Sequence, residues 1–227
     1  MATTRQLRSP LHQAGGLAYH LARECDDEGI ARLLAARFVH EPMGAALGLT
    51  EAELYEFVRR FLPGRTSTGF SIVAIAEGPA DVLAGAFINR DFKAPVPVGV
   101  PEEFPRWSPI FAAVGKVDEA YEAQVPGLEA GQALDLWMVG VDPSYSRRGV
   151  ARNLFRLSVE VARRQGFERC VAECTGAFSQ RAAVEAGFRE RASVTYQDFL
   201  FEGRPVFASI PEPHVKVALY ERVLFPR

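Results

Sequence analysis

A strand, a tight turn and a long amphipathic helix follow one another between residues 133 and 166, and this succession constrains the fold more than any other feature. The run from Ala133 to Val141 (ALDLWMVGV) is apolar and has the length of a buried strand. Asp142-Pro143-Ser144-Tyr145 predicts a turn. From about Arg148 to Gln165 apolar residues recur at helical spacing, and Gly166 is a natural C-terminal cap. A buried strand that leads directly into such a helix indicates an α/β fold.

The rest of the chain repeats these two patterns. Strands are predicted over residues 16–24, 70–76, 82–89, 169–174, 188–199 and 214–224, and helices over 26–38, 50–61 and 176–186. Residues 78–81 predict the turn between two of these strands. The resulting order predicts one mixed α/β domain over residues 17–227, preceded by a loose arm over residues 1–16.

An insertion at about residues 94–132 interrupts this rhythm. Five prolines fall between positions 95 and 109 and predict an extended segment, while Val114 to Gln124 could form a short helix. The segment is longer than an ordinary connection, so it is either functional or an ornament. Its sequence alone does not decide between the two.

Composition narrows the classes of function. The 227 residues carry a net charge of −2, so no global field favours nucleic acid or an anionic membrane. No apolar run approaches the length of a membrane span. The three cysteines cannot form a paired framework, and they lack partners at zinc-ligand spacing. A cytoplasmic globular protein without a metal site is therefore expected.

The start of the long helix is the segment most able to do chemistry. It reads Ser146-Arg147-Arg148-Gly149-Val150-Ala151 and follows the predicted turn. The first turn of a helix presents unpaired N–H groups and positive potential, and a glycine there lets a phosphate approach the backbone. The segment has the spacing of neither a Walker loop nor a dinucleotide fingerprint. Taken alone, it could equally be a solvated basic helix start.

This segment resembles the cofactor loop of the GNAT acetyltransferases, Gln/Arg-x-x-Gly-x-Gly/Ala. It matches at Gly149 and Ala151 and departs at Ser146, where the family has Arg or Gln. Glu185-Ala186-Gly187-Phe188 is similar to the ending of a later helix in the family. The resemblance spans residues 17–225 and implies a GNAT fold, with a mixed sheet of six to seven strands flanked by about four helices. It also implies acetyl-CoA as cosubstrate.

Three further motifs resemble the insect dopamine and arylalkylamine N-acetyltransferases within that family. They are Phe38-x-x-Glu41-Pro42, the run Glu173 to Ser179, and Pro213-His214-Val215, and they occur in the family's order. Together they are more specific than any one alone. They imply an acetyl group moved to a primary amine by direct attack in a ternary complex, with an arylalkylamine-like acceptor favoured.

The resemblance also implies which residues bind the cosubstrate. In the family, a strand pairs with the pantetheine arm, a backbone N–H meets the thioester carbonyl, and the helix start holds the pyrophosphate. The corresponding residues in this chain are Met138, Val139, Val141, Arg147, Arg148, Gly149, Val150, Ala151 and Arg152. The three strand residues are also ordinary core positions by their side chains, so only their backbone would be functional.

The resemblance implies Glu41 as general base and the hydroxyls of Thr175 and Ser179 as a proton relay. Taken alone, Glu41 could be a surface residue at a helix end, and Thr175 could be a helix N-cap. The tyrosine acid of many GNAT enzymes is replaced by Ala183, which favours a hydroxyl or water relay. His214 is more typical of a structural histidine than of a catalytic one.

Other features leave alternatives open. Phe57, Phe61, Trp137 and Phe178 could line an aromatic amine pocket, although core packing would also explain them. His40-Glu41 begins a zincin-like string, but residue 44 is Gly, so no metal site follows. The acceptor could instead be a polyamine, an amino acid, an antibiotic or a protein N-terminus. The chain could also be a non-catalytic CoA-binding sensor. A homodimer is compatible with either reading.

Overall fold

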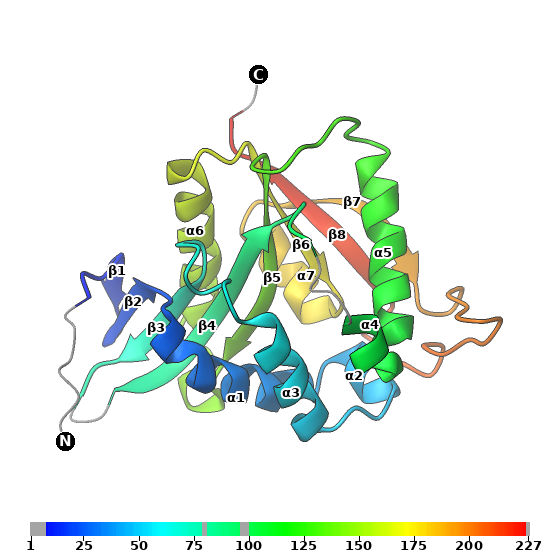
Figure 1. The fold of residues 1–227 in the computed structure, drawn as a ribbon, viewed down its shortest axis with the longest axis horizontal. Helices are drawn as coiled ribbons and strands as arrows, with labels where there is room; N and C mark the ends of the chain where they lie inside the picture. The colour runs from blue at the N-terminus through cyan, green and yellow to red at the C-terminus, as the bar shows by residue number, and fades with distance from the viewer. Residues whose placement is uncertain (1–7, 79–80, 96–99, 226–227) are drawn as a thin grey trace.

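The computed structural model describes residues 8–78, 81–95 and 100–225, and its centre is one mixed sheet of eight strands (Figure 1). The strands lie in the order β1-β2-β3-β4-β5-β6-β8-β7, and β5 with β6 is the one parallel pair among them. Their bounds are β1 His12–Ala14, β2 Leu17–Leu21, β3 Ile72–Ala76, β4 Val82–Asp91, β5 Ala133–Val141, β6 Arg169–Cys174, β7 Arg189–Thr195 and β8 Lys216–Val223.

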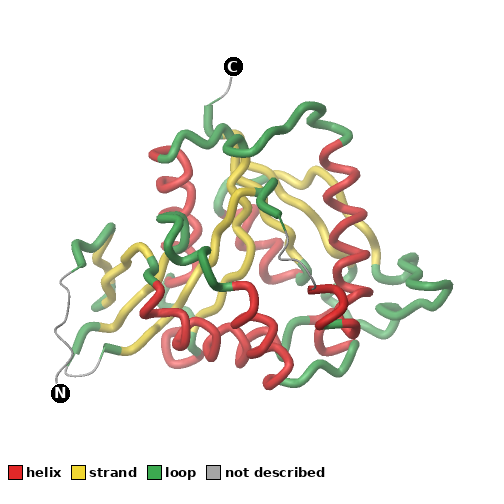
Figure 2. The backbone as a smooth tube through the Cα atoms, in the orientation of Figure 1, coloured by secondary structure: helices red, strands yellow, loops and turns green. Residues whose placement is uncertain are grey.

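Helices cover both faces of this sheet (Figure 2). They are α1 Asp27–Phe38, α2 Pro42–Ala46, α3 Glu51–Phe61, α4 Val100–Glu103, α5 Ser108–Glu122, α6 Val150–Arg164 and α7 Ala177–Glu185. Helices α6 and α7 pack on one face, against β3 to β6 and β8. On the opposite face, α1 packs on β4 and β5 with α3 against it, and α5 packs on β7 and β8. The sheet is therefore the middle of three layers.

The alternation of side chains along the strands explains these layers. On β8, Ala218 and Tyr220 belong to the core beneath α6 and α7, whereas Val217 and Leu219 belong to the core beneath α5. Close approach of α6 depends on Gly85 of β4, because a Cβ at that position would lie 2.9 Å from a methyl group of Val150. The two faces therefore follow from a period of two along the strands.

Most of the elements predicted from sequence are present, and the predicted mixed α/β fold is confirmed. The sheet has more strands than predicted. Part of the difference is β1: residues 12–14 pair with β2, so the prediction of a loose arm is wrong for them. The last part of the strand predicted over 188–199 is wrong, because β7 ends at Thr195. The turn predicted over residues 78–81 lies partly outside the described residues.

The insertion at residues 94–132 is helical where an extended chain was predicted. Helix α5 spans 15 residues and begins at Ser108, ahead of the short helix predicted from Val114. Pro109 occupies its first turn, where a proline costs no hydrogen bond because the N–H there has no partner. Residues 96–99 lie outside the described part of the chain. Pro109 therefore marks a helix start and not an extended chain.

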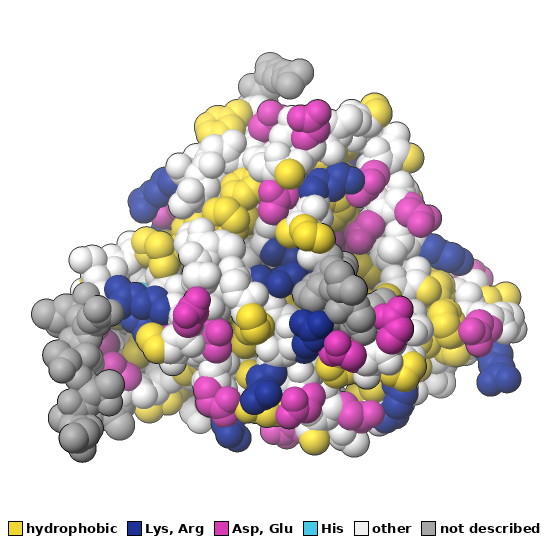
Figure 3. Space-filling view, viewed as in Figure 1, with side chains coloured by type: hydrophobic (Ala, Val, Ile, Leu, Met, Phe, Trp, Pro, Cys, Tyr) yellow, Lys and Arg dark blue, Asp and Glu magenta, His cyan; other side chains and the backbone are white. Residues whose placement is uncertain are grey.

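The surface shows no field of one sign on the face in Figure 3, where acidic and basic side chains are interspersed. This distribution agrees with the net charge of −2. No helix among the described residues is long and apolar enough to cross a membrane.

Candidate active site

Strands β5 and β6 separate in the middle of the sheet, and the candidate site lies where they part. They pair only from Ala133 to Asp135 on β5 and from Arg169 to Val171 on β6. Beyond this point β5 continues along β4, and β6 continues along β8. The facing edges of the two strands therefore carry backbone N–H and C=O groups without a strand partner, which could pair with an extended ligand.

A bulge in β5 lies where β5 and β6 separate. Ile88 of β4 pairs with Met138 while Asn89 pairs with Leu136, so Trp137 is an extra residue on β5. A bulge bends its strand and changes which face the following side chains occupy. Leu136 accordingly belongs to the core beneath α6, whereas Met138 belongs to the core beneath α1 and α3.

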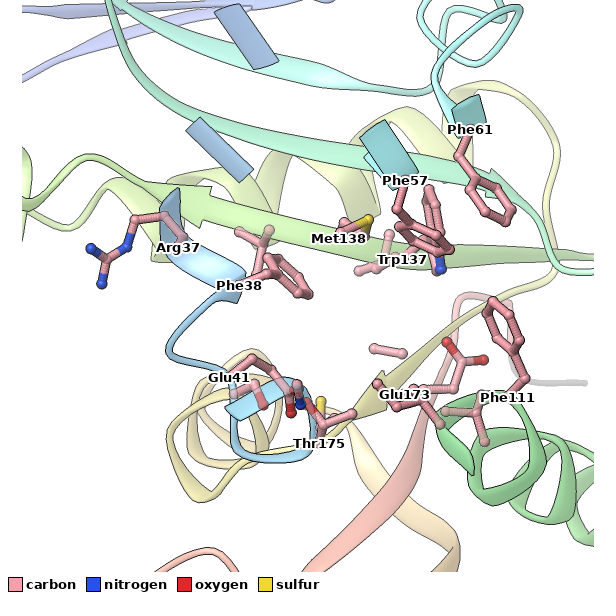
Figure 4. Close-up of a pocket in the computed structure, with 18 of the residues that line it drawn as sticks. Arg37, Phe38, Glu41, Phe57, Phe61, Phe111, Trp137, Met138, Glu173 and Thr175 are labelled. Carbon is pink, nitrogen blue, oxygen red and sulfur yellow. The ribbon is translucent and has the colours of Figure 1, made fainter. Parts of the chain in front are cut away.

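A cavity of about 560 Å³ lies at this separation (Figure 4). Its walls come from α1, α3, α5, β5 and β6, and most of the lining is apolar. The aromatic part is built around Phe57, whose ring stacks on Trp107 with the ring centroids 3.7 Å apart. The aromatic side chains that line the cavity are Phe38, Phe57, Phe61, Phe87, Trp107, Phe111, Trp137 and Phe155. Of the predicted pocket aromatics, Phe178 does not line the cavity and is 66% exposed.

Glu41 places a carboxylate at the wall of this cavity. It is the N-cap of α2, and its Oε2 atom accepts hydrogen bonds from the backbone N–H groups of Met43 (3.1 Å) and Gly44 (2.9 Å). Its Oε1 atom is buried and accepts no backbone hydrogen bond among the described residues, which leaves the Thr175 hydroxyl as a neighbour of the carboxyl. Burial raises the pKa of Glu41, while the Thr175 hydroxyl and the two N–H groups oppose the increase. A carboxylate in this setting is a stronger base than an exposed one.

The motifs that resemble the insect enzymes meet around Glu41 although they are far apart in sequence. A Cβ atom at Gly176 would lie 3.2 Å from Nδ1 of His214 and 3.5 Å from Cγ of Pro42. Nδ1 of His214 accepts a hydrogen bond from the backbone N–H of Ala177 at 3.1 Å. His214 therefore caps the first turn of α7, which supports the structural role expected for it.

Thr175 and Ser179 both line the cavity, but their local roles differ from the predicted ones. Thr175 precedes α7, whose N-cap is Gly176, so the prediction that the two hydroxyls share one helical face is wrong, as is the reading of Thr175 as the N-cap. Ser179 caps the helix start in its place: its Oγ accepts from Gly176 N (3.3 Å) and donates to Gly176 O (2.9 Å). The backbone carbonyl of Thr175 accepts a hydrogen bond from the hydroxyl of Tyr196.

A second cavity, of about 390 Å³, lies at the predicted cofactor loop. The turn is held by Asp142, whose Oδ1 accepts from Ser144 N at 2.8 Å. Arg147 and Gly149 both adopt positive φ, 59° and 76°, and α6 starts at Val150. Because a helix cannot pair the N–H groups of its own first turn, those of α6 are free to receive a phosphate.

Most of the predicted cofactor residues line one of the two cavities. Met138 and Val139 line the first, and the second is lined by Val141, Arg147, Gly149, Val150, Ala151 and Arg152. Arg148 lines neither cavity. Its guanidinium donates to the carbonyl of Gly15 at 2.9 Å and lies over the ring of Tyr145, so its side chain is directed toward the N-terminal hairpin.

Two acidic residues of the first cavity were missed by the sequence analysis. Asp118 belongs to α5, in the segment whose purpose the sequence did not decide, and Glu173 lies on β6. Glu173 could have been noticed in the sequence, because it interrupts the apolar run of β6 between Cys170 and Cys174. Among the described residues, no group of His, Cys, Asp and Glu side chains could hold a metal ion.

A comparison with protein-family models finds a match over residues 111–188 to the acetyltransferase (GNAT) family. This range includes most of α5 and the whole of β5, α6, β6 and α7, and residues within it line both cavities. The match bears out the prediction of a GNAT-type acyltransferase.

Solved structures of similar fold include several proteins that handle amines. Arylalkylamine N-acetyltransferase 2 from Aedes aegypti has a TM-score of 0.76 at 21% identity, over 93% of this chain and all of that chain. The C-terminal condensation domain of Ebony, in complex with β-alanyl-dopamine, has a TM-score of 0.78 at 13% identity, over 91% and 98% of the two chains. An agmatine N-acetyltransferase has a TM-score of 0.73 at 21% identity, over 92% and 100%. These likenesses confirm the predicted fold.

Proposed function

We propose that this chain, which has a GNAT domain match and the GNAT fold, transfers an acetyl group from acetyl-CoA to a primary amine. The observation that supports this most is the course of β5. Met138 and Val139 line the aromatic cavity with Glu41, and Val141 lines the second cavity, at the start of α6. A cosubstrate with an extended arm between a thioester and a pyrophosphate matches this arrangement.

The chemistry follows from the groups at the wall of the aromatic cavity. A primary ammonium has a pKa near 10 and must lose a proton before its nitrogen can attack. Glu41 accepts that proton, directly or through a water molecule, and the neutral amine attacks the thioester carbonyl. The carbon–sulfur bond then breaks, and the second proton of the attacking nitrogen passes to the CoA thiolate through the hydroxyls of Thr175 and Ser179 or through water. The products are an N-acetyl amine and CoA.

The lining of the first cavity favours an arylalkylamine-like acceptor. Aromatic rings offer a flat apolar acceptor both dispersion contacts and edge-to-face contacts. A polyamine, an amino acid, an antibiotic or a protein N-terminus would leave more of these apolar surfaces without a matching group. A panel with several amines of each class and acetyl-CoA tests this preference, and a higher kcat/KM for any other class than for the best arylalkylamine, aromatic diamines included, would overturn it.

The same panel of amines distinguishes an enzyme from a CoA-binding sensor. A sensor would give heat on titration with acetyl-CoA but would release no CoA with any amine. The buried carboxylate of Glu41 at the apolar cavity favours the enzyme, because a module that only binds CoA has no use for a base there. The predicted single domain, cytoplasmic location and homodimer stay predictions.

The hydroxyls of Thr175 and Ser179 should differ in how much they contribute to the free energy of unfolding. Ser179→Ala removes the hydroxyl that holds Gly176 and should lower the free energy of unfolding by about 1 kcal/mol. Thr175→Val keeps the side-chain shape and removes a hydroxyl that caps no helix but interacts with the buried Glu41 carboxyl. Any loss in this variant should therefore disappear at low pH, where Glu41 is protonated, whereas the loss in Ser179→Ala should persist. Urea denaturation of both variants at low pH measures this difference, and equal losses there would contradict the assignment of the cap to Ser179.

The same variants test the proton relay. If both hydroxyls serve thiolate protonation, each variant should lower kcat, by up to roughly 10²-fold, and the double variant should be no slower than the slower single variant. The acetyl-CoA affinity should be near normal in all three proteins. Full activity in Thr175→Val across the pH range would assign the protonation to water.

A further inference from the structure

We propose that Asp118 and Glu173 form a second subsite of the acceptor cavity, which recognises a positively charged group on the acceptor other than the amine that is acetylated. The proposal rests on the proposed function and narrows its substrate class to amines with a second cation at the far end. The two carboxyls come from different layers of the fold, α5 and β6, and both line the same cavity as Glu41.

The two ends of the cavity are distinct. Figure 4 shows Glu41 beside Thr175 at one end, whereas Glu173 projects toward Phe111 and Trp137. Glu173 lies two residues before Thr175 along the same stretch of chain, which corresponds to about 7 Å at the rise of a strand. An acceptor whose reacting amine lies at Glu41 would thus present its opposite end to Glu173. The separation is long enough to hold an aromatic ring between the two ends.

The carboxyls at this end have unused hydrogen-bonding capacity. Oδ1 of Asp118 and Oε1 of Glu173 are both buried and accept no hydrogen bond from another group of the described residues, so the two carboxyls can satisfy one another only by sharing a proton. A buried acceptor without a donor costs about 1–3 kcal/mol, so a structural pair would be expected to have its partners within the protein. The cavity beside them instead offers room for a ligand's donors.

The cations nearby are already engaged. Arg90 donates from Nε to Oδ2 of the fully buried Asp135 at 2.6 Å, and its positive charge also opposes the rise in the pKa values of Asp118 and Glu173. Arg65 donates to the carbonyl of Phe61 and lies over the ring of Trp137. The three carboxyls of Asp118, Asp135 and Glu173 thus share the one positive charge of Arg90, so their full ionisation would leave negative charge unbalanced.

The raised pKa values of Asp118 and Glu173 are those expected of two carboxyls that lack a cation of their own beside them. Desolvation, aided by Asp135, raises the pKa of Asp118 to about 7 and that of Glu173 well above its ordinary value. The two carboxyls contact one another, so the pair holds a proton near pH 7 in the absence of ligand. A ligand cation would favour the charged pair and displace that proton. The aromatic walls would also attract the cation through their ring faces.

A matched pair of amines tests the subsite. The acceptors 1,4-bis(aminomethyl)benzene and 4-ethylbenzylamine have the same size and differ at the far end by an ammonium in place of a methyl group. A charge-assisted contact should give the diamine about 10- to 100-fold higher kcat/KM, after allowance for its two equivalent amines. In the double variant Asp118→Asn, Glu173→Gln, this preference should disappear.

Glu122→Gln is the matched control. Glu122 lies near Asp118 on the same helix, but it is at the surface and pairs with Lys93 at 2.7 Å. This variant removes a nearby negative charge without changing the cavity, so the preference for the diamine should persist. The subsite is refuted if the wild-type protein does not prefer the diamine, or if the double variant keeps the preference.

Calorimetry on the wild-type protein tests the subsite without relying on turnover or on the folding of a variant. Titration of wild-type protein with each amine, in two buffers of different ionisation enthalpy near pH 7, counts the protons released. The diamine should bind more tightly and release more protons than 4-ethylbenzylamine, and equal affinity and equal release would refute the subsite. If neither amine is acetylated but the diamine binds in this way, the proposed function fails while the subsite stands.

Discussion

The Glu41→Gln variant is expected to lose roughly 10²–10⁴-fold in kcat, the usual contribution of a positioned general base. Glutamine keeps the size of the side chain and a carbonyl oxygen that can accept the hydrogen bonds of Met43 and Gly44, so α2 should keep its cap. It cannot accept the ammonium proton. Initial rates with saturating acetyl-CoA and an arylalkylamine measure the loss, and calorimetry should show unchanged acetyl-CoA affinity.

The pH dependence gives a second test of Glu41. The base acts when it is ionised, and burial raises its pKa above the ordinary 4.5, so kcat should rise with pH through a midpoint above 4.5. Folding favours the protonated form of such a group. Its contribution to stability is therefore complete below pH 4.5 and is lost as the pH rises through the folded-state pKa. The acidic limb of the rate profile should be absent in Glu41→Gln.

Glu51→Gln serves as the control, because Glu51 is an exposed residue of α3 that does not line the cavity. It should show wild-type rates at every pH. Wild-type turnover in Glu41→Gln would remove the base from this position and leave His40 and His214 as the next candidates.

The Gly149→Glu variant is expected to lose acetyl-CoA binding, by roughly 10²-fold or more in affinity. A negative charge at the helix start opposes the pyrophosphate, and two unit charges 4 Å apart near a protein surface interact by about 4 kcal/mol. Space alone does not forbid the substitution, because a Cβ at Gly149 would meet nothing within 4 Å. Calorimetric titration with acetyl-CoA measures the affinity.

Gly149→Lys is the matched control for backbone strain. Gly149 has a φ of 76°, a conformation that costs any residue with a side chain about 1–2 kcal/mol. Both variants should therefore unfold somewhat more easily, by similar amounts, but only Gly149→Glu should add repulsion. Equal losses of affinity in the two variants would assign the effect to bulk or strain rather than to a pyrophosphate.

The elements that the sequence predicted well are those governed by local chemistry. Helix α3 begins where the Thr50–Glu53 capping box predicts, and both reciprocal hydrogen bonds are present. Helix α6 and β5 lie within two residues of their predicted bounds, because a strong apolar period and a glycine stop define them. The meeting of Glu41-Pro42 with Gly176 and His214 was not predicted, because the three segments are far apart in sequence.

The errors lie where tertiary contacts decide. No local pattern marks Trp137 as a bulge residue, because a bulge is defined by the register with β4. The capping roles of Thr175 and Ser179 depend on where β6 ends, and one residue of shift moved the cap to Gly176. Asp118 could not be predicted to reach the cavity, because its position follows from the packing of α5 on β7 and β8.

Transfer of a labelled acetyl group tests the central claim most directly. Wild-type protein incubated with acetyl-CoA carrying a ¹³C-labelled acetyl group and an arylalkylamine should yield the labelled N-acetyl amine and one CoA per amide, detected by mass spectrometry. Glu41→Gln should yield the same products far more slowly. Binding of acetyl-CoA without a labelled amide from any amine would contradict the account and identify the chain as a CoA-binding module.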